Sequence, residues 1–295
     1  MPLLSDLKNS SCLFESAVGA TSTENEAFLA RLTSSSKAVV PSTRPSLFVL
    51  QGECALCQGS PKFDMVGSDD ATTCVVVVIT GENRMVYVAH VDESSCDESL
   101  VEALTACTDH GQSRAKVYLA GGYDGSVGDS VLRNLMTSSS GLETQVSLEL
   151  CCLGEINRDE RGFPRTRALA VDLQSGTPYP FTFEYRGPEI SRRHAQRSLA
   201  TGCRLYPLVK RSGVMHLAPL KVILGYGDKF FYERLLTVAK DDPDEFLQQY
   251  STSPLHESDM FIPDMVGMIT FMLSMNGKTV PEAHYEMTGS EWRTV

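Results

Sequence analysis

At residues 67–79 the chain runs Gly67-Ser68-Asp69-Asp70-Ala71-Thr72-Thr73-Cys74-Val75-Val76-Val77-Val78-Ile79, so a thiol lies where a polar segment becomes an apolar one. The β-branched run after Cys74 is typical of a buried strand. A second apolar run at residues 85–89 follows the turn-forming residues 80–84 and ends at His90. These two runs predict an antiparallel β-hairpin with the thiol near its open end.

The expected register of this hairpin brings the thiol to an imidazole. If Ile79 faces Met85 across a five-residue loop, counting back along both strands sets Cys74 opposite His90. Directly opposed residues share one face of the sheet, with Cβ atoms roughly 4.5–5.5 Å apart. We therefore expect a Cys–His contact in which the ring takes the proton from sulfur. A slip of one residue would move the two side chains to opposite faces.

The composition indicates a globular chain that repels polyanions. The chain has 295 residues, of which 42% are hydrophobic and 21% charged, and we expect residues 1–295 to form one domain. Its net charge of −11 opposes binding to nucleic acid or to an anionic membrane surface. A cationic group, such as the free α-amine of a peptide, would be attracted instead.

The cysteines and the chain start suggest a reducing compartment. Nine cysteines occur without a repeating framework, which favours reduced thiols. The first residues carry no basic segment followed by an apolar one, and no apolar run approaches the ~18 residues of a membrane span. We expect the cytoplasm, with the nucleus as the alternative.

Hydrophobic periodicity predicts a mixed α+β fold with a largely antiparallel sheet. Strands are expected, besides the hairpin, at residues 47–51, 115–120, 146–153, 167–173 and 180–183. Helices are expected at residues 23–32, 95–111, 127–136, 189–199, 229–240, 243–250 and 259–274.

The candidate residues have simpler interpretations beside the catalytic one. Cys74 could be a buried structural cysteine, and His110 is a rival base near the end of a predicted helix. Asp69 and Asp70 would favour the protonated thiol, so they are not expected to activate it. They could instead bind a substrate ammonium group, or simply form part of a solvated turn. We expect no metal, because the pair Cys54 and Cys57 has no second CxxC to complete a tetrahedral site.

The segment at residues 67–74 resembles the nucleophile segment of the protein N-terminal asparagine amidohydrolase family, which converts an N-terminal Asn to Asp for degradation signalling. Further motifs over residues 45–260 occur in the order that this family shows. They are Gln51, Ser60-Pro61, His90-Val91-Asp92, Gly121-Gly122, Glu155-Ile156-Asn157, Arg186-Gly187-Pro188-Glu189 and Ser251-Thr252-Ser253-Pro254.

The resemblance implies an α-β-β sandwich related to the cytotoxic necrotizing factor-like cysteine hydrolases, with a Cys, His and Ser triad and no cofactor. Cys74 and His90 match the first two members. Three serines compete for the third place: Ser251 and Ser253, which we rank first, and Ser60 of the Ser-Pro turn.

The implied reaction is hydrolysis of the N-terminal Asn side-chain amide through a thioester on Cys74, feeding the N-degron pathway of ubiquitin-dependent degradation. Specificity would need an anionic partner for the α-ammonium, for which Asp69, Asp70 and Glu155 are candidates. Asn157 is a candidate reader of the short side-chain amide. The alternatives are a non-catalytic scaffold that binds peptide N-termini and a broader Cys–His amidase or peptidase.

Overall fold

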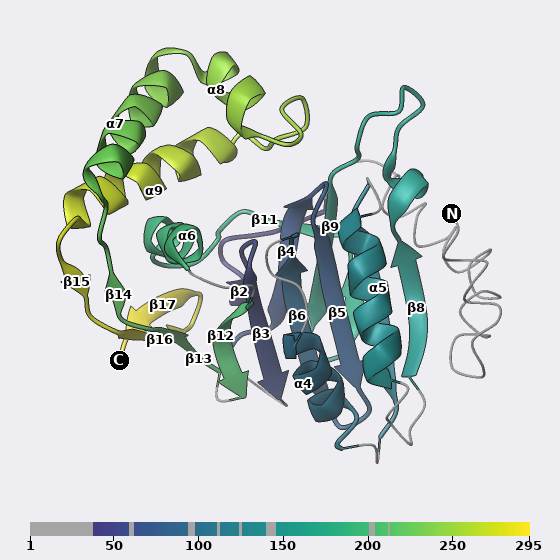
Figure 1. The fold of residues 1–295 in the computed structure, drawn as a ribbon. Helices are drawn as coiled ribbons and strands as arrows, with labels where there is room; N and C mark the ends of the chain where they lie inside the picture. The colour runs from purple at the N-terminus through teal and green to yellow at the C-terminus, as the bar shows by residue number, and fades with distance from the viewer. Residues whose placement is uncertain are drawn as a thin grey trace.

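The computed structural model describes residues 38–58, 62–93, 98–110, 113–123, 126–139, 146–200, 204–211 and 213–295. Two β-sheets are stacked, and the two helices α4 (Glu98–Cys107) and α5 (Ser126–Ser139) cover the outer face of the larger one (Figure 1). The layers therefore follow the order helix, sheet, sheet, which confirms the predicted α-β-β sandwich.

The larger sheet has nine strands and the smaller has four in the described part of the chain. In spatial order the larger sheet contains β17 (Glu291–Thr294), β16 (Ala283–Thr288), β13 (Val214–Leu217), β12 (Tyr206–Arg211), β3 (Glu53–Gln58), β6 (Met85–Val91), β5 (Val75–Gly81), β7 (Ala115–Gly121) and β8 (Val146–Cys152). The smaller sheet contains β10 (Thr177–Tyr179), β9 (Arg167–Asp172), β4 (Met65–Ala71) and β2 (Ser46–Phe48). Two further pairs are β1 (Ala38–Val40) with β11 (Phe181–Phe183) and β14 (Leu220–Lys221) with β15 (Thr279–Val280). Most pairs are antiparallel, whereas β3 with β12, β7 with β8, β2 with β4, and β1 with β11 are parallel.

The hairpin of β5 and β6 is buried on both faces because helices cover one face and the smaller sheet covers the other. Val75, Val77 and Ile79 pack against α4 and α5. Val76 and Val78 face the smaller sheet. A strand buried on both faces needs a continuous apolar run rather than alternation, which explains the valine block.

The predicted register of this hairpin is wrong by two residues. The loop between the strands has three residues, Arg84 adopts a left-handed conformation with φ of 62°, and Val76 rather than Cys74 pairs with His90. A three-residue hairpin loop that ends in a left-handed residue is a common geometry. Because the shift is an even number of residues, Cys74 and His90 still share a face, as diagonal rather than directly opposed neighbours.

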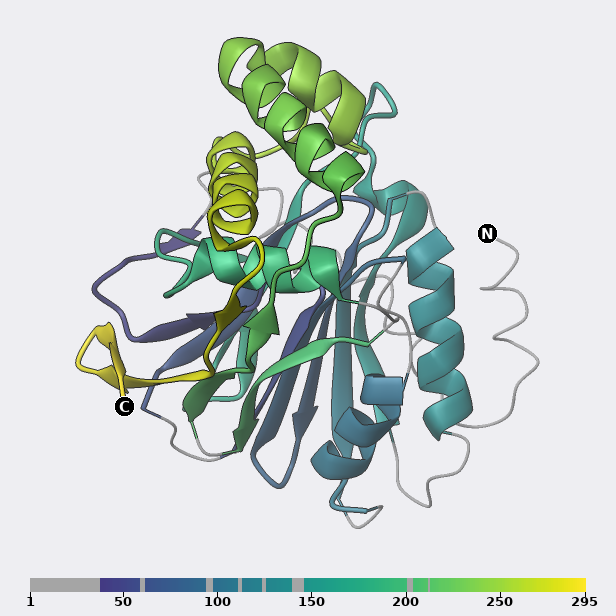
Figure 2. The same cartoon turned by 60° about the vertical axis from the view of Figure 1, so that its left-hand side comes forward.

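A helical lobe stands over one end of the sandwich (Figures 1 and 2). It contains α6 (Ile190–Leu199), α7 (Tyr226–Asp241), α8 (Pro243–Tyr250) and α9 (Phe261–Met275). These helices share their own hydrophobic core, centred on Phe246, Ile269 and Met272. The methionines of α9 fill this core. The lobe matters for function because it closes over the ends of the strands that carry Cys74 and His90.

Most predicted helices and strands are present, and the elements that were not predicted are mostly strands. The helices expected after residue 95 correspond to α4–α9, whereas the helix expected at residues 23–32 lies outside the described residues. The strands that were not predicted are β1, β3, β4, β10 and β12–β17. The main correction is β4, because Met65–Ala71 forms a strand of the smaller sheet in the polar segment before Cys74, where none was expected. In β3, Cys54 faces one hydrophobic core and Cys57 the other, so the two thiols of this pair point to opposite faces. No described helix has the length and apolar character needed to cross a bilayer.

Candidate active site

A cavity of about 300 Å³ lies between the end of the sandwich and the helical lobe. Its lining comes from four parts of the chain: strand ends and adjoining loops of the sandwich (Phe48, Leu50, Gln51, Asp69, Asp70, Thr72, Thr73, Cys74, His90, Arg186), α6 (His194, Arg197), the segment around the end of α8 and before α9 (Tyr250, Ser251, Thr252, Glu257, Ser258), and α9 (Phe261, Asp264, Met265). This size is at the lower end of ligand pockets, which suits the end of a peptide or another small group.

Cys74 is held at the cavity wall by a glycine turn on the neighbouring strand. Gly122 N donates to Cys74 O at 2.7 Å, and Gly121 adopts a φ of 118°. A Cβ added to Gly121 would lie 2.1 Å from Cys74 O, so only glycine allows this approach of the two backbones. Asn157 donates to Gly121 O and thereby fixes the turn from behind. Cys74 is 9% exposed and lines the cavity.

His90 is oriented by a serine of the other sheet. The Ser68 hydroxyl, on β4, lies 2.7 Å from His90 Nδ1 and donates to Val49 O at 2.6 Å. A serine hydroxyl has one hydrogen, so when it is given to Val49 the oxygen accepts from Nδ1–H. This arrangement leaves Nε2 without a proton. The imidazole is therefore in the tautomer that acts as a base through Nε2.

Cys74 and His90 line the same cavity, but the sulfur makes its hydrogen bond elsewhere. Among the described residues, the partner of Cys74 Sγ is Thr73 Oγ1 at 3.8 Å. The diagonal register explains the absence of a direct Cys–His hydrogen bond, because diagonal neighbours are farther apart than directly opposed ones.

Both groups are neutral at rest. Burial, followed by the charge of Asp92, raises the pKa of the Cys74 thiol to about 12. Burial, followed by the charge of Arg197, lowers the pKa of His90 to about 4. The resting pair is therefore a thiol and an uncharged imidazole. A stable thiolate–imidazolium pair is disfavoured in this environment.

Asp69 and Asp70 are gathered around a guanidinium by a break in strand β4. The pairing of β4 with β9 shifts between Ser68 and Ala71, and Asp70 has a left-handed φ of 57°. A bulge re-aims side chains that would otherwise alternate between faces. Arg186 consequently contacts Asp69 Oδ1 at 3.1 Å and also forms an ion pair with Asp70.

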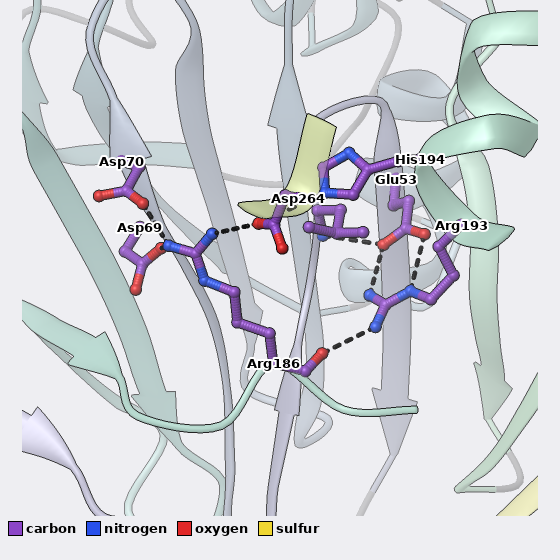
Figure 3. Close-up of polar contacts among 8 residues, drawn as sticks. Glu53, Asp69, Asp70, Arg186, Arg193, His194 and Asp264 are labelled. Atoms are coloured by element: carbon purple, nitrogen blue, oxygen red, sulfur yellow. Dashed lines mark hydrogen bonds and ion pairs between the residues drawn. The ribbon is translucent and has the colours of Figure 1, made fainter. Parts of the chain in front are cut away.

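Arg186 is the centre of a larger charged cluster. Its other terminal nitrogen contacts Asp264 Oδ2 of α9 at 3.1 Å, so the guanidinium lies between the sandwich and the lobe (Figure 3). Arg193 of α6 donates to Arg186 O at 2.8 Å and forms a buried ion pair with Glu53 (Figure 3). These contacts lock the loop before α6 and fix one side of the cavity.

The predicted serines Ser251 and Ser253 bind a carboxylate rather than His90. Both hydroxyls donate to Glu257 Oε1, that of Ser253 at 3.2 Å. Ser253 Oγ also lies 2.9 Å from Thr72 Oγ1, two residues before Cys74. The Ser-Thr-Ser-Pro turn therefore docks the helical lobe onto the nucleophile segment and presents Glu257 to the cavity.

Three other predicted site residues lie elsewhere. Ser60 lies outside the described residues. Glu155 is exposed, does not line the cavity and forms an ion pair with Arg158. Asn157 is fully buried, accepts from Arg167 Nε at 2.6 Å and does not line the cavity either, so its amide has a structural role. The rival base His110 is exposed at the end of α4, outside the cavity lining.

Sequence reasoning missed Ser68 and Glu257 as parts of this site. Ser68 lies in the quoted motif, six residues before Cys74, but its contact with His90 joins two different sheets. Glu257 follows the Ser-Thr-Ser-Pro turn by three residues, and an acidic residue after such a turn was the available signal.

One group of three side chains in the described part of the chain has the geometry to hold a metal ion. His216, Glu282 and His284 have ligand atoms within 4.8 Å of one another, on and beside the paired strands β13 and β16. None of the three lines the cavity.

Comparisons with a family model and with individual proteins point to the same family. Residues 34–284, which include every residue that lines the cavity, match the sequence model of the family described as protein N-terminal asparagine amidohydrolase. Proteins of that name from Homo sapiens and Sus scrofa are each 29% identical to the chain over 240 residues, which cover 77% of this chain and 74% of theirs. The Mus musculus protein of the same name is 27% identical over the same shares.

Proposed function

The chain belongs to the protein N-terminal asparagine amidohydrolase family, and we propose that it hydrolyses the side-chain amide of an N-terminal Asn in peptides and proteins, giving Asp and ammonia. The observation that carries the proposal is the shared cavity of Cys74 and His90, in which Ser68 sets the tautomer of the imidazole. This combination supplies a nucleophile and a base from side chains alone.

In the first half of the reaction, Cys74 Sγ attacks the carboxamide carbon of the substrate while His90 Nε2 accepts the thiol proton. The neutral resting state of both groups favours a transfer that is coupled to the attack. Gln51 lines the cavity and uses one amide hydrogen on Asp92 at 2.9 Å, so its second amide hydrogen is available for the developing oxyanion.

The tetrahedral adduct then collapses. The C–N bond breaks, and the imidazolium of His90 returns its proton to the departing nitrogen, which leaves as ammonia. An acyl thioester remains on Cys74. In the second half, His90 removes a proton from water, the hydroxide oxygen attacks the thioester carbon, and sulfur leaves as the re-protonated thiol. The product is an N-terminal Asp.

We also propose that this product places the enzyme in a degradation pathway that reads protein N-termini, in the cytoplasm or nucleus. Conversion of an uncharged side chain into a carboxylate changes what a later recognition protein meets at the N-terminus. The substrate partner is therefore a protein or peptide with a free N-terminal Asn.

The proposal is tested by incubating the protein with three peptides that differ only at their first residue: Asn-Xaa, Gln-Xaa and N-acetyl-Asn-Xaa. A mass gain of ~1 Da with release of ammonia is expected for the first peptide alone, because a methylene of extra length misplaces the Gln amide carbon. Equal turnover of all three would support a broader amidase. Binding without turnover would support a non-catalytic scaffold.

A further inference from the structure

The acidic groups of the cavity differ in their partners. Asp69, Asp70 and Asp264 all contact the guanidinium of Arg186. Glu257 instead accepts hydrogen bonds from two neutral hydroxyls, those of Ser251 and Ser253. Within the part of the chain that the structure describes, no cationic side chain forms an ion pair with Glu257. Its charge is thus the least compensated of the carboxylates that line the cavity.

Glu257 lines the same cavity as Cys74 and Asp70. Burial and then the charge of Asp92 raise the pKa of Cys74, and the charge of Glu257 adds to this effect. Burial, with a further contribution from the charge of Asp70, raises the pKa of Glu257. Two carboxylates that line one small cavity repel each other, and a bound cation would relieve that repulsion. The contact between Thr72 and Ser253 fixes this geometry relative to Cys74.

We propose that Glu257 is the receptor for the α-ammonium group of the substrate, with Asp70 as a secondary contact. This inference rests on the proposed function, since it assigns the residue that makes the reaction require a free N-terminus. The Ser-Thr-Ser-Pro turn acts as the support that holds the receptor carboxylate, and its serines are positioning residues.

The covalent geometry of asparagine agrees with this assignment. The α-nitrogen and the side-chain amide carbon are separated by three bonds, so they lie at most about 3.8 Å apart. The ammonium receptor must therefore line the same cavity as Cys74. Glu257 and Asp70 satisfy this condition, whereas Glu155 does not. For glutamine, the extra methylene moves the amide carbon away from an ammonium anchored at the same point.

The bound ammonium has a second consequence for the chemistry. Burial and the charge of Asp92 are the main reasons why the thiolate of Cys74 is disfavoured, and the charge of Glu257 adds to them, so a cation placed on Glu257 offsets that added part when the substrate is present. The free thiol stays protonated, and the substrate itself promotes its deprotonation. The amine is therefore expected to affect the turnover rate as well as binding.

The test is a double-mutant cycle between Glu257→Gln and removal of the substrate amine. The two substrates are an Asn-Xaa peptide and its des-amino analogue, a succinamoyl-Xaa peptide that keeps the reacting amide. For the wild type, kcat/KM is expected to fall by about 100-fold or more when the amine is removed. Glu257→Gln should lose a similar factor on the Asn peptide and less than about threefold on the analogue, because the contact is already absent.

Equal losses for Glu257→Gln on both substrates would overturn the assignment, since Glu257 would then act on the fold or the chemistry. Glu155→Gln, which changes an exposed carboxylate outside the cavity, serves as the matched control and should keep wild-type activity on both peptides. In the Glu257→Gln variant the amide oxygen can still accept hydrogen bonds from both serines, and thermal melting checks that the variant is folded.

A binding measurement separates failure of this inference from failure of the reaction. In a Cys74→Ala background, calorimetry compares an Asn peptide with its N-acetylated form, with and without Glu257→Gln. The inference predicts that the free amine strengthens binding at least about tenfold and that Glu257→Gln abolishes the difference. Persistence of the full difference in the Glu257→Gln protein would refute the inference even if turnover by the unmodified enzyme were established.

Discussion

Ser68 Oγ lies 2.7 Å from His90 Nδ1, so a residue of the smaller sheet sets the protonation of a base on the larger one. The same hydroxyl donates to Val49 O, which leaves Nδ1 as the donor and Nε2 as the acceptor. The two sheets therefore have to be stacked before the imidazole is held in this tautomer. The site is a property of the sandwich rather than of the hairpin alone.

Replacement of Ser68 by alanine should lower kcat by about 10- to 100-fold with little change in KM, because the imidazole loses the partner that fixes its tautomer and orientation. Steady-state kinetics with an Asn-initiated peptide measures both constants. Ser138→Ala is the matched control, since the Ser138 hydroxyl only donates within helix α5 at 2.6 Å. An unchanged kcat for Ser68→Ala would remove Ser68 from the catalytic group.

The free energy of unfolding should fall as the pH is lowered from 7, because His90 is buried and neutral in the folded protein. Burial and the charge of Arg197 lower the pKa of His90 to about 4, whereas an unfolded histidine titrates near 6.5. Between these values the unfolded chain binds a proton that the folded chain does not. The contribution of His90 to stability is therefore complete above about pH 6.5 and is lost as the pH falls through about 4, with a total of about 3 kcal/mol.

Urea denaturation at pH 7 and pH 5 measures this effect. The unfolding free energy of the wild type should fall by about 2 kcal/mol more than that of His90→Gln over this interval. A variant with the same loss as the wild type would show that His90 is not held neutral in the fold.

The glycine turn behind the nucleophile gives a steric prediction. In Gly121→Ala the new methyl group would lie 2.1 Å from Cys74 O, so the strand must shift and carry Cys74 with it. We expect destabilisation by more than about 3 kcal/mol and loss of most activity. Gly277→Ala is the control, because Gly277 also has a positive φ, of 78°, but its Cβ would meet nothing within 4 Å. It should cost only about 1 kcal/mol and leave turnover unchanged.

The stability of the fold should depend on the shape of the Arg186 guanidinium as well as on its charge. Arg186→Met should destabilise the fold by about 3–5 kcal/mol, because Asp69, Asp70 and Asp264 would remain in a mostly buried site without their counter-ion. Arg186→Lys should recover only part of this loss, since an ammonium cannot bridge the carboxylates as a planar guanidinium does. In contrast, Arg293→Met removes an exposed ion pair with Glu291 and should change stability by less than about 1 kcal/mol. Equal effects at both arginines would contradict the account of the cluster.

The mixed α+β class and the hairpin were predictable from the sequence because their signals are local, whereas the order of the layers came from the family resemblance. The apolar run after Cys74 identified a strand buried on both faces, and the turn composition identified its partner. The loop length was wrong because the residues flanking the turn also fit into the strands. The conclusion that Cys74 and His90 share a face survived, because the error was an even number of residues. The edge strand β17 and its neighbour β16 were not predicted, because both contain many polar residues and β17 has only four residues.

The rest of the site could not be predicted, because it depends on contacts between distant segments. Ser68 reaches His90 only when two sheets stack, and Glu257 reaches the cavity only when the helical lobe covers the strand ends. The Ser-Thr-Ser-Pro motif was recognised as important, but its serines contact Glu257 instead of the imidazole. A motif indicates that a segment matters, whereas the partner of each hydroxyl is decided by tertiary packing.

In the proposed mechanism, the Cys74 sulfur is the nucleophile that attacks the substrate amide. The most direct test compares ammonia release from an Asn-initiated peptide by the wild type and by Cys74→Ala, with melting curves to show that both are folded. We predict steady release by the wild type and none above background by Cys74→Ala. Retained release by the folded variant would contradict the account.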